Sequence, residues 1–245
     1  MDRVKFLNTY IDNLSMQEAI CRADDLIKNK GSSYIVTPNL DHIVILEEDN
    51  EFAEIYKNAD LILADGKPLI WISRFLKKPI KEKISGSDFF PNLCTLCAQN
   101  GYSIFILGAA EGIAEKAAYN LCSRIHNLKI VGTYSPPLGF EDNEYELNKI
   151  KKIIKKSAPD VLAVSLGSPK GEKFVYRHLK EYNVSLGISI GATIDFEAGN
   201  VKRAPKWMSE CGLEWSYRII QDPKRLIKRY WNDAIKIIPI INKYK

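Results

Sequence analysis

Short apolar runs alternate with helical patterns along most of the chain, and this alternation limits the fold more than any other feature. Several runs are apolar almost without a break, as in Val161–Leu166, which is typical of strands that helices cover on both faces. We therefore expect an α/β, Rossmann-like, doubly wound and mostly parallel sheet. Strands are predicted at 4–10, 33–37, 61–65, 102–107, 129–131, 161–166 and 185–190, and helices at 15–29, 40–58, 87–100, 113–127, 143–157 and 171–182.

Glycine or polar residues follow five of these strands, at the ends where ligands bind in open α/β sheets. One such end would fit a simple turn, because Gly and Pro are common in these connections. Five together favour one ligand crevice at the carboxyl edge of the sheet. The five are Thr37-Pro38-Asn39, Asp65-Gly66, Gly108 to Gly112, Gly167-Ser168-Pro169 and Gly191 to Asp195.

Two of these strand ends could carry chemistry. Asp65 ends an apolar strand, where partial burial would suit its carboxylate to general-base catalysis, although it could instead cap a helix beginning near Gly66. Gly108 and Gly112 open a helix whose N–H groups could hold a phosphate, but they match neither a dinucleotide fingerprint nor a P-loop. The sequence has no Asp-x-Asp pair and no paired histidines, so we expect no metal and no cofactor.

The positive charge of the chain is concentrated in its last part. Lys and Arg total 35 against 30 Asp and Glu, but residues 218–245 alone carry a net charge of +6, which leaves −1 for the first 217 residues. This distribution excludes a uniformly basic nucleic-acid coat. A hydrophobic content of 46% likewise excludes a disordered chain.

The compartment can also be predicted from the sequence. Charged residues directly follow Met1, and no uncharged apolar stretch approaches the ~18–20 residues of a membrane span, so we expect neither a signal peptide nor a transmembrane helix. Five scattered cysteines favour a reducing cytoplasm.

Within the basic segment, apolar residues recur at helical spacing and form one stripe, with most basic residues off it. A basic amphipathic helix with Trp and Tyr is typical of peripheral attachment to a membrane surface. Docking on the protein's own core or a homo-oligomer interface is the alternative. Nucleic-acid binding is disfavoured, because an isoleucine stripe has no use on a phosphate backbone. The stripe follows Leu226 and consists of Ile227, Tyr230, Trp231, Ala234, Ile235, Ile238 and Ile241.

Taken in order, the motifs of this chain resemble those of the WecG/TagA/CpsF family of bacterial glycosyltransferases, over about Val4 to Tyr230. Any one of them would be weak evidence, but the ordered set is specific. The matching pieces are Thr37-Pro38-Asn39, Ala64-Asp65-Gly66, Ser85-Gly86-Ser87-Asp88, Leu107-Gly108-Ala109, Gly167 to Lys170, Gly199 to Trp207, and Gly212-Leu213-Glu214-Trp215 with Arg218.

The resemblance implies an inverting, metal-independent transfer from a UDP-sugar, best guessed as UDP-N-acetylmannosamine, to N-acetylglucosaminyl-diphospho-undecaprenol, in wall teichoic acid or related polysaccharide synthesis. Capsule or exopolysaccharide synthesis with another UDP-sugar is an alternative. It implies that Asp65 is the general base and that Thr37 is the second catalytic residue, which lines the sugar pocket with Asn39. It also implies that Asp195 hydrogen-bonds the uracil and that Phe140 stacks on it. The other residues implied in substrate binding are Asn39, Lys83, Gly108 and Arg203.

Two positions depart from the family pattern. The family usually has Arg where Lys83 stands, and Gln where Gly171 stands. Lysine keeps the charge but loses the bidentate fork that suits phosphate, and Gly171 removes a side-chain amide. The reaction class survives both changes, while the identity of the donor sugar becomes open.

The resemblance also suggests a role for the basic segment. Without a metal, cations must neutralise the departing UDP, and Arg218, Arg225 and Arg229 are the candidates. We therefore expect a transferase core over 1–204 and a helical appendage over 205–245 that binds the inner face of the membrane and completes the site. A Rossmann-like oxidoreductase or methyltransferase, and a nucleotide-binding, lipid-associated module without turnover, are the alternatives.

Overall fold

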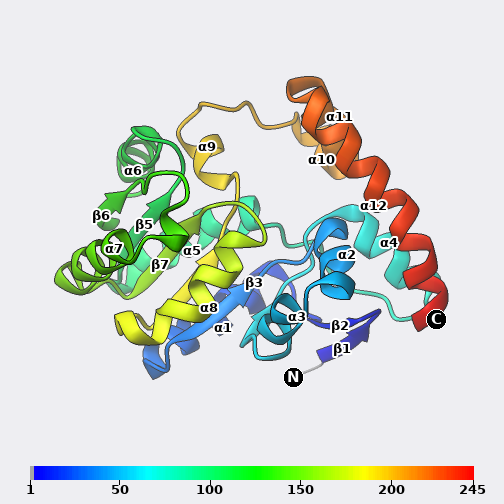
Figure 1. Ribbon diagram of the computed structural model, residues 1–245, viewed down its shortest axis with the longest axis horizontal. Helices are drawn as coiled ribbons and strands as arrows, with labels where there is room; N and C mark the ends of the chain where they lie inside the picture. The colour runs from blue at the N-terminus through cyan, green and yellow to red at the C-terminus, as the bar shows by residue number, and fades with distance from the viewer. Residues whose placement is uncertain (1–2) are drawn as a thin grey trace. The chain divides into compact units, whose positions relative to one another are not determined.

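The computed structural model describes residues 3–245, apart from the side chains of residues 206, 210 and 225. The chain has the predicted α/β, Rossmann-like architecture, with a parallel sheet flanked by helices (Figure 1). The strands are β1 (Arg3–Phe6), β2 (Thr9–Asp12), β3 (Ser33–Val36), β4 (Leu61–Ile62), β5 (Ser103–Gly108), β6 (Lys129–Tyr134), β7 (Val161–Ser165) and β8 (Leu186–Ser189). The helices are α1 (Met16–Asn29), α2 (Leu40–Glu48), α3 (Asn50–Lys57), α4 (Lys67–Phe75), α5 (Gly86–Asn100), α6 (Ile113–Arg124), η1 (Phe140–Asp142), α7 (Glu144–Ser157), α8 (Lys170–Tyr182), α9 (Thr193–Glu197), α10 (Lys206–Glu210), α11 (Glu214–Gln221) and α12 (Pro223–Tyr244).

The main sheet has the strand order β4-β3-β8-β7-β5-β6. The ladders that join β3, β8, β7, β5 and β6 are all parallel, with Ile35 opposite Ile188 and Ile104 opposite Val161. Strands β3, β7 and β8 are buried along their whole length. Their continuous apolar character therefore reflects cover on both faces, as the sequence predicts.

Two of the sequence predictions for single elements are wrong. The strand expected at 4–10 is an antiparallel hairpin of β1 and β2, whose chain reverses at Leu7, a non-glycine residue with φ +47°. The helix expected at 40–58 is divided at Asp49, which ends α2 and caps α3 by accepting a hydrogen bond from the Phe52 N–H. Both breaks occur without Gly or Pro, the residues that most often mark them.

The chain forms two compact units, and each is described by itself. One unit contains β3, β5 to β8 and the helices α1 and α5 to α9, within residues 16–36 and 86–201. The other gathers residues up to 15, residues 37–85 and residues 202–245. The predicted division into a transferase core and an appendage is a division by role, and it stays a prediction.

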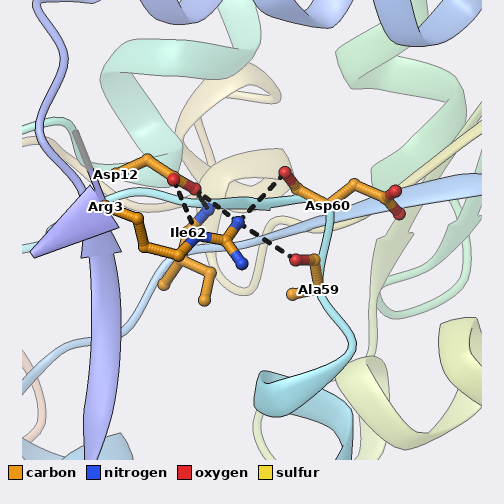
Figure 2. Close-up of polar contacts among 5 residues, drawn as sticks. All are labelled: Arg3, Asp12, Ala59, Asp60 and Ile62. Atoms are coloured by element: carbon orange, nitrogen blue, oxygen red, sulfur yellow. Dashed lines mark hydrogen bonds and ion pairs between the residues drawn. The ribbon is translucent and has the colours of Figure 1, made fainter. Parts of the chain in front are cut away.

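In the second unit, a buried carboxylate ties the hairpin to β4. Asp12, with both oxygens engaged, accepts hydrogen bonds from Arg3 at 2.8 and 2.9 Å and from the backbone N–H of Ile62 at 2.8 Å. Arg3 also donates to the carbonyls of Ala59 and Asp60, and Figure 2 shows how the guanidinium bridges these segments. The Asp12 carboxylate is the main cause of the raised pKa of Arg3. This network fixes the segment that leads into Asp65.

The long helix α12 packs along α2 in the same unit (Figure 1). Leu226, Ile237 and Ile240 are buried on its inner face. Ion pairs join the helices, among them Lys236 with Glu48 at 2.6 Å and Lys243 with Glu47 at 2.7 Å. The inner face of α12 therefore packs on the protein itself, which was the alternative to membrane attachment in the sequence analysis.

The outer face of α12 carries the apolar stripe predicted from the sequence. Ile227, Trp231, Ile235 and Ile238 are between 54% and 68% exposed. The helix thus has two apolar faces, of which the structure covers one. In the described part of the chain, no helix combines the length and apolar character needed to cross a bilayer.

Candidate functional site

A pocket of about 310 Å³ lies wholly within the unit that contains α2, α4 and α12. Its volume is in the range of small-molecule sites. Its lining comes from the segment after β4, from the starts of α2 and α4, from Lys83 before α5, and from α10, α11 and α12. The lining residues are Asn39, Leu40, Asp41, Asp65, Gly66, Lys67, Pro68, Lys83, Ser209, Gly212, Glu214, Trp215, Arg218, Arg229, Tyr230, Asp233 and Ala234.

Asp65 reaches this pocket from the segment after β4, three residues beyond the end of the strand. Its backbone N–H donates to the carbonyl of Pro38 at 2.8 Å, which joins the two predicted strand ends. The N-cap of α4 is Gly66, which makes no side-chain capping bond, so the capping alternative for Asp65 is wrong. The residue is half-buried and lines the pocket.

Asn39 has a structural role, which is one reason for an asparagine in the Thr37-Pro38-Asn39 motif. It is the N-cap of α2, and its side-chain oxygen accepts a hydrogen bond from the backbone N–H of His42 at 3.1 Å. The side-chain amide nitrogen is the group left for a ligand in the pocket. Thr37, two residues earlier, is buried and is not among the lining residues.

Four cationic side chains line the pocket, and three of them are residues predicted from the sequence. Lys83, Arg218 and Arg229 were expected to contact substrate or the leaving group, and Lys67 joins them from the first turn of α4. The aromatic rings of Trp215 and Tyr230 meet edge to face, with their centroids 6.2 Å apart. The pocket therefore offers both positive charge and apolar surface.

A buried acidic cluster lies where α12 meets α2. Arg229 approaches Asp41, with 3.9 Å between Nη1 and Oδ2, and Asp233 follows Arg229 by one helical turn. Burial, and then the nearby negative charge of Asp41, raise the pKa of Asp233 to about 6. Behind the cluster, burial and the charge of Arg229 lower the pKa of His42 to about 3, so that this histidine is neutral. Its Nδ1 is paired with the hydroxyl of Tyr56 at 2.7 Å.

Several predicted site residues lie outside this pocket. Gly108, Phe140 and Asp195 belong to the other unit, and Arg203 is exposed in the loop before α10. Phe140 is 3% exposed and packs against Phe174, with the ring centroids 5.8 Å apart. The roles expected for these four residues stay predictions. Arg225 lies in α12, but its side chain is outside the described residues.

Two of the glycines are explained by packing. A Cβ on Gly108, which has φ +104°, would lie 2.8 Å from the carbonyl carbon of Ser165 at the end of β7. A Cβ on Gly171 would collide with the side chain of Ser189 on β8. Ser189 thus fills the space that a larger residue at position 171 would need, which gives the departure at Gly171 a structural reason.

Sequence reasoning missed the acidic cluster. Asp41 and Asp233 are far apart in the sequence, and no local pattern pairs them. A signal was nevertheless present, because Asp233 shares a helical face with Leu226, Ile237 and Ile240. A single acidic residue on an otherwise apolar, buried face is unusual and indicates a special environment. Lys67 was missed because the helix beginning near Gly66 was considered only as an alternative, as a helix that Asp65 could cap.

The sequence match decides the family of this protein. Residues 4–245 match the model of the glycosyl transferase WecG/TagA/CpsF family. The chain belongs to this family. The family resemblance inferred from the ordered motifs is therefore confirmed, and the protein is a glycosyltransferase of the WecG/TagA/CpsF family.

Two relatives carry a more specific name. A Bacillus subtilis (strain 168) protein is 33% identical over 201 residues, which cover 81% of this chain and 75% of the relative. A Staphylococcus aureus (strain MW2) protein is 28% identical over 240 residues, which cover 97% of this chain and 90% of the relative. Both are named N-acetylglucosaminyldiphosphoundecaprenol N-acetyl-beta-D-mannosaminyltransferase.

Proposed function

We propose that this WecG/TagA/CpsF family member transfers N-acetylmannosamine from a UDP-sugar to N-acetylglucosaminyl-diphospho-undecaprenol, with inversion and without a metal, in cell-surface polysaccharide synthesis. The observation that carries the proposal is the pocket in which Asp65 lies with Lys83, Arg218 and Arg229. The names of the two relatives support the choice of sugar and acceptor.

The proposed reaction assigns a role to each charged group. Asp65 takes the proton from the acceptor hydroxyl as its oxygen attacks the anomeric carbon from the face opposite the phosphate. The new glycosidic C–O bond forms while the bond to the phosphate oxygen breaks, and UDP leaves with the electron pair. Lys83, Arg218 and Arg229 stabilise the negative charge on the departing diphosphate, as a metal ion would in other enzymes.

The lipid acceptor requires that the enzyme work at a membrane, and the outer stripe of α12 supports that location. Exposed Ile227, Trp231, Ile235 and Ile238 offer apolar surface to the lipid interface. Fewer cations are available than the net charge suggests, because Arg229, Lys236 and Lys243 face acidic residues of α2. Exposed Lys224 and Lys228 remain beside the stripe and would each contribute about 1 kcal/mol on an anionic surface.

A direct assay tests the transfer. The protein is incubated with a short-chain N-acetylglucosaminyl-diphospholipid and a panel of UDP-sugars, with and without a chelator. We expect one added N-acetylhexosamine by mass spectrometry, the same rate with the chelator, and an inverted anomeric centre by NMR. No transfer from any donor would overturn the proposal, and UDP binding without transfer would favour the module without turnover.

Asp65→Asn tests the general base. Because the amide cannot accept the proton, we expect kcat to fall by roughly 10²–10⁴-fold, while the affinity for UDP changes little. Asp25→Asn, at an exposed position on α1, is the control and should retain full activity. An unchanged kcat in Asp65→Asn would remove Asp65 from the proposed role.

Membrane attachment is tested with vesicles that contain anionic lipid. We expect Trp231→Ala together with Ile235→Ala to reduce binding at least tenfold, because two apolar anchors are lost. Tyr145→Ala, which removes a 78% exposed aromatic ring on α7, is the control and should bind normally. Equal binding of both variants would exclude the stripe as the membrane contact.

A further inference from the structure

The acidic cluster between α2 and α12 contains groups whose hydrogen-bonding capacity is unused. The Asp233 side chain interacts with that of Asp41, yet its Oδ2 is buried without a hydrogen-bond partner among the described residues. The Nε of Arg229 is also buried without a partner in this part of the chain. All three residues line the pocket. Buried polar atoms normally find partners, so this arrangement calls for an explanation.

Two neighbouring carboxylates cannot both stay ionised at low cost, because like charges repel and burial disfavours charge. One proton shared between Asp41 and Asp233 removes this repulsion and supplies a donor between them. With one proton shared, the pair carries a single negative charge, which matches the single positive charge of Arg229. When the proton leaves, the two negative charges of the pair hold the Arg229 side chain of α12 beside Asp41 of α2.

We propose that the Asp41–Asp233 carboxyl pair positions the Arg229 guanidinium in the pocket and couples anion binding there to the uptake of one proton. The inference rests on the proposed role of Arg229 in holding the diphosphate. A bound diphosphate attracts Arg229 and adds negative charge beside the pair. Both effects favour the protonated pair, so a proton from the buffer forms an O–H bond on one of the two carboxyl groups.

The surroundings of the pair agree with this coupling. The charge of Asp41 and burial raise the pKa of Asp233, while Arg229 and Lys236 lower it, which leaves a value of about 6. The carboxyl group is therefore largely ionised without ligand near neutral pH, and an anion can raise its proton occupancy. The remaining titratable or charged groups around the pocket are His42 on α2, Lys67, Asp65, Lys83, Glu214, Arg218 and Tyr230.

Calorimetry of UDP binding tests the coupling. Heats are measured near pH 6.5 in two buffers with different ionisation enthalpies, neither of them phosphate, for the wild type and Asp233→Asn. If UDP raises the pKa of the pair by about one unit, the wild type takes up about half a proton more than the variant. The titration of UDP itself occurs in both proteins and cancels in the difference.

A pH series distinguishes positioning from a merely structural role. Between pH 6.5 and 8.5 we expect the wild type to lose about threefold more UDP affinity than Asp233→Asn, because the ionised pair retains Arg229. Asp41→Asn removes the same shared proton from the other helix, so it should behave alike. It also keeps the test decisive if circular dichroism shows that Asp233→Asn does not fold.

Glu47→Gln is the matched control. It alters a carboxyl group on α2 that pairs with Lys243 of α12, outside the pocket lining. Its proton uptake should equal that of the wild type. Equal uptake by the wild type, Asp233→Asn and Asp41→Asn, with UDP bound by each, would overturn the inference and leave the proposed function intact. Failure of the folded wild type to bind UDP would overturn both.

Discussion

Gly171 lies in the first turn of α8, where Ser189 on β8 already fills the space for a side chain. We expect Gly171→Ala to lower the free energy of unfolding by about 1–3 kcal/mol, because the added methyl group overpacks the contact. Ser189→Ala removes the colliding oxygen, although its Cβ stays 3.3 Å from the new methyl group. The double variant should therefore recover most of the loss in a urea titration. Equal losses in the single and double variants would contradict this packing account.

The buried carboxyl group of Asp233 also predicts how stability depends on pH. Its folded pKa of about 6 lies above the ordinary value of 3.8 for an aspartate, so folding takes up a proton between these values. The contribution of Asp233 to stability is therefore greatest below pH 4 and is lost as the pH rises through 6. Relative to the wild type, Asp233→Asn should gain stability between pH 5 and 8. Thermal melts across this range measure the difference, and parallel curves for the two proteins would contradict it.

At the scale of single residues, the sequence predicted several of the side chains that line the pocket, but few of the contacts that position them. Asp65, Asn39 and Lys83 were expected at one site because each lies near a strand end or in a family motif, and all three line the pocket. The cap formed by Asn39 was visible in principle, since Asn is a preferred N-cap residue. The contact between Asp41 and Asp233 was not, because it depends on how two distant helices pack.

Among the elements, the α10–α11 turn is held to α4 by a close contact at Gly212. Gly212 has φ +77°, and a Cβ there would lie 2.8 Å from the indole ring of Trp71. We expect Gly212→Ala to lower stability by at least about 1 kcal/mol, since both the backbone conformation and the contact disfavour a side chain. It should also reduce kcat, because α11 carries Arg218 into the pocket.

A second variant separates these two effects of Gly212→Ala. Trp71→Phe removes the part of the ring that would meet the new methyl group. In the double variant we expect stability and activity to recover together and in part, because the contact is relieved while the positive φ still disfavours alanine. Recovery of stability alone would mean that the turn does not position Arg218. Urea titrations and initial rates, measured on the same protein preparations, provide the comparison.

Helices and strands could be predicted where the sequence pattern that identifies them lies within the element itself. The buried strands β3, β7 and β8 were located within two residues, because continuous apolar runs identify them. Helix α4 was considered only as an alternative, although Pro68 near its start is typical of a helix N-terminus. The inner apolar face of α12 was missed, because the outer stripe of the same helix has a similar spacing.

At the scale of the whole molecule, the basic segment belongs to the fold of one unit as well as to its pocket. A variant that ends at residue 204 would lose buried Leu226, Ile237 and Ile240, each worth about 1.5–3 kcal/mol. We expect it to melt at a lower temperature and to aggregate. Its loss of activity would therefore not identify a catalytic role for the segment.

Arg218→Ala is the sharper test, because it removes one half-buried cation from the pocket and keeps α12 in place. We expect a loss of at least tenfold in kcat with little change in melting temperature. Lys57→Ala, which removes an exposed cation on α3 outside the pocket lining, should retain activity. Equal rates in the wild type and both variants would exclude Arg218 from the stabilisation of the leaving group.

The ribosome completes the synthesis of one unit before that of the other. All the residues of the unit that contains β5 to β8 have been synthesised once translation passes residue 201. The pocket unit combines early segments with residues 202–245, so Asp65 is made long before Arg229 and Asp233. Folding proceeds as the chain emerges. The nascent protein therefore holds its sheet before it has a pocket, which is complete only once α12 has been made and has packed along α2.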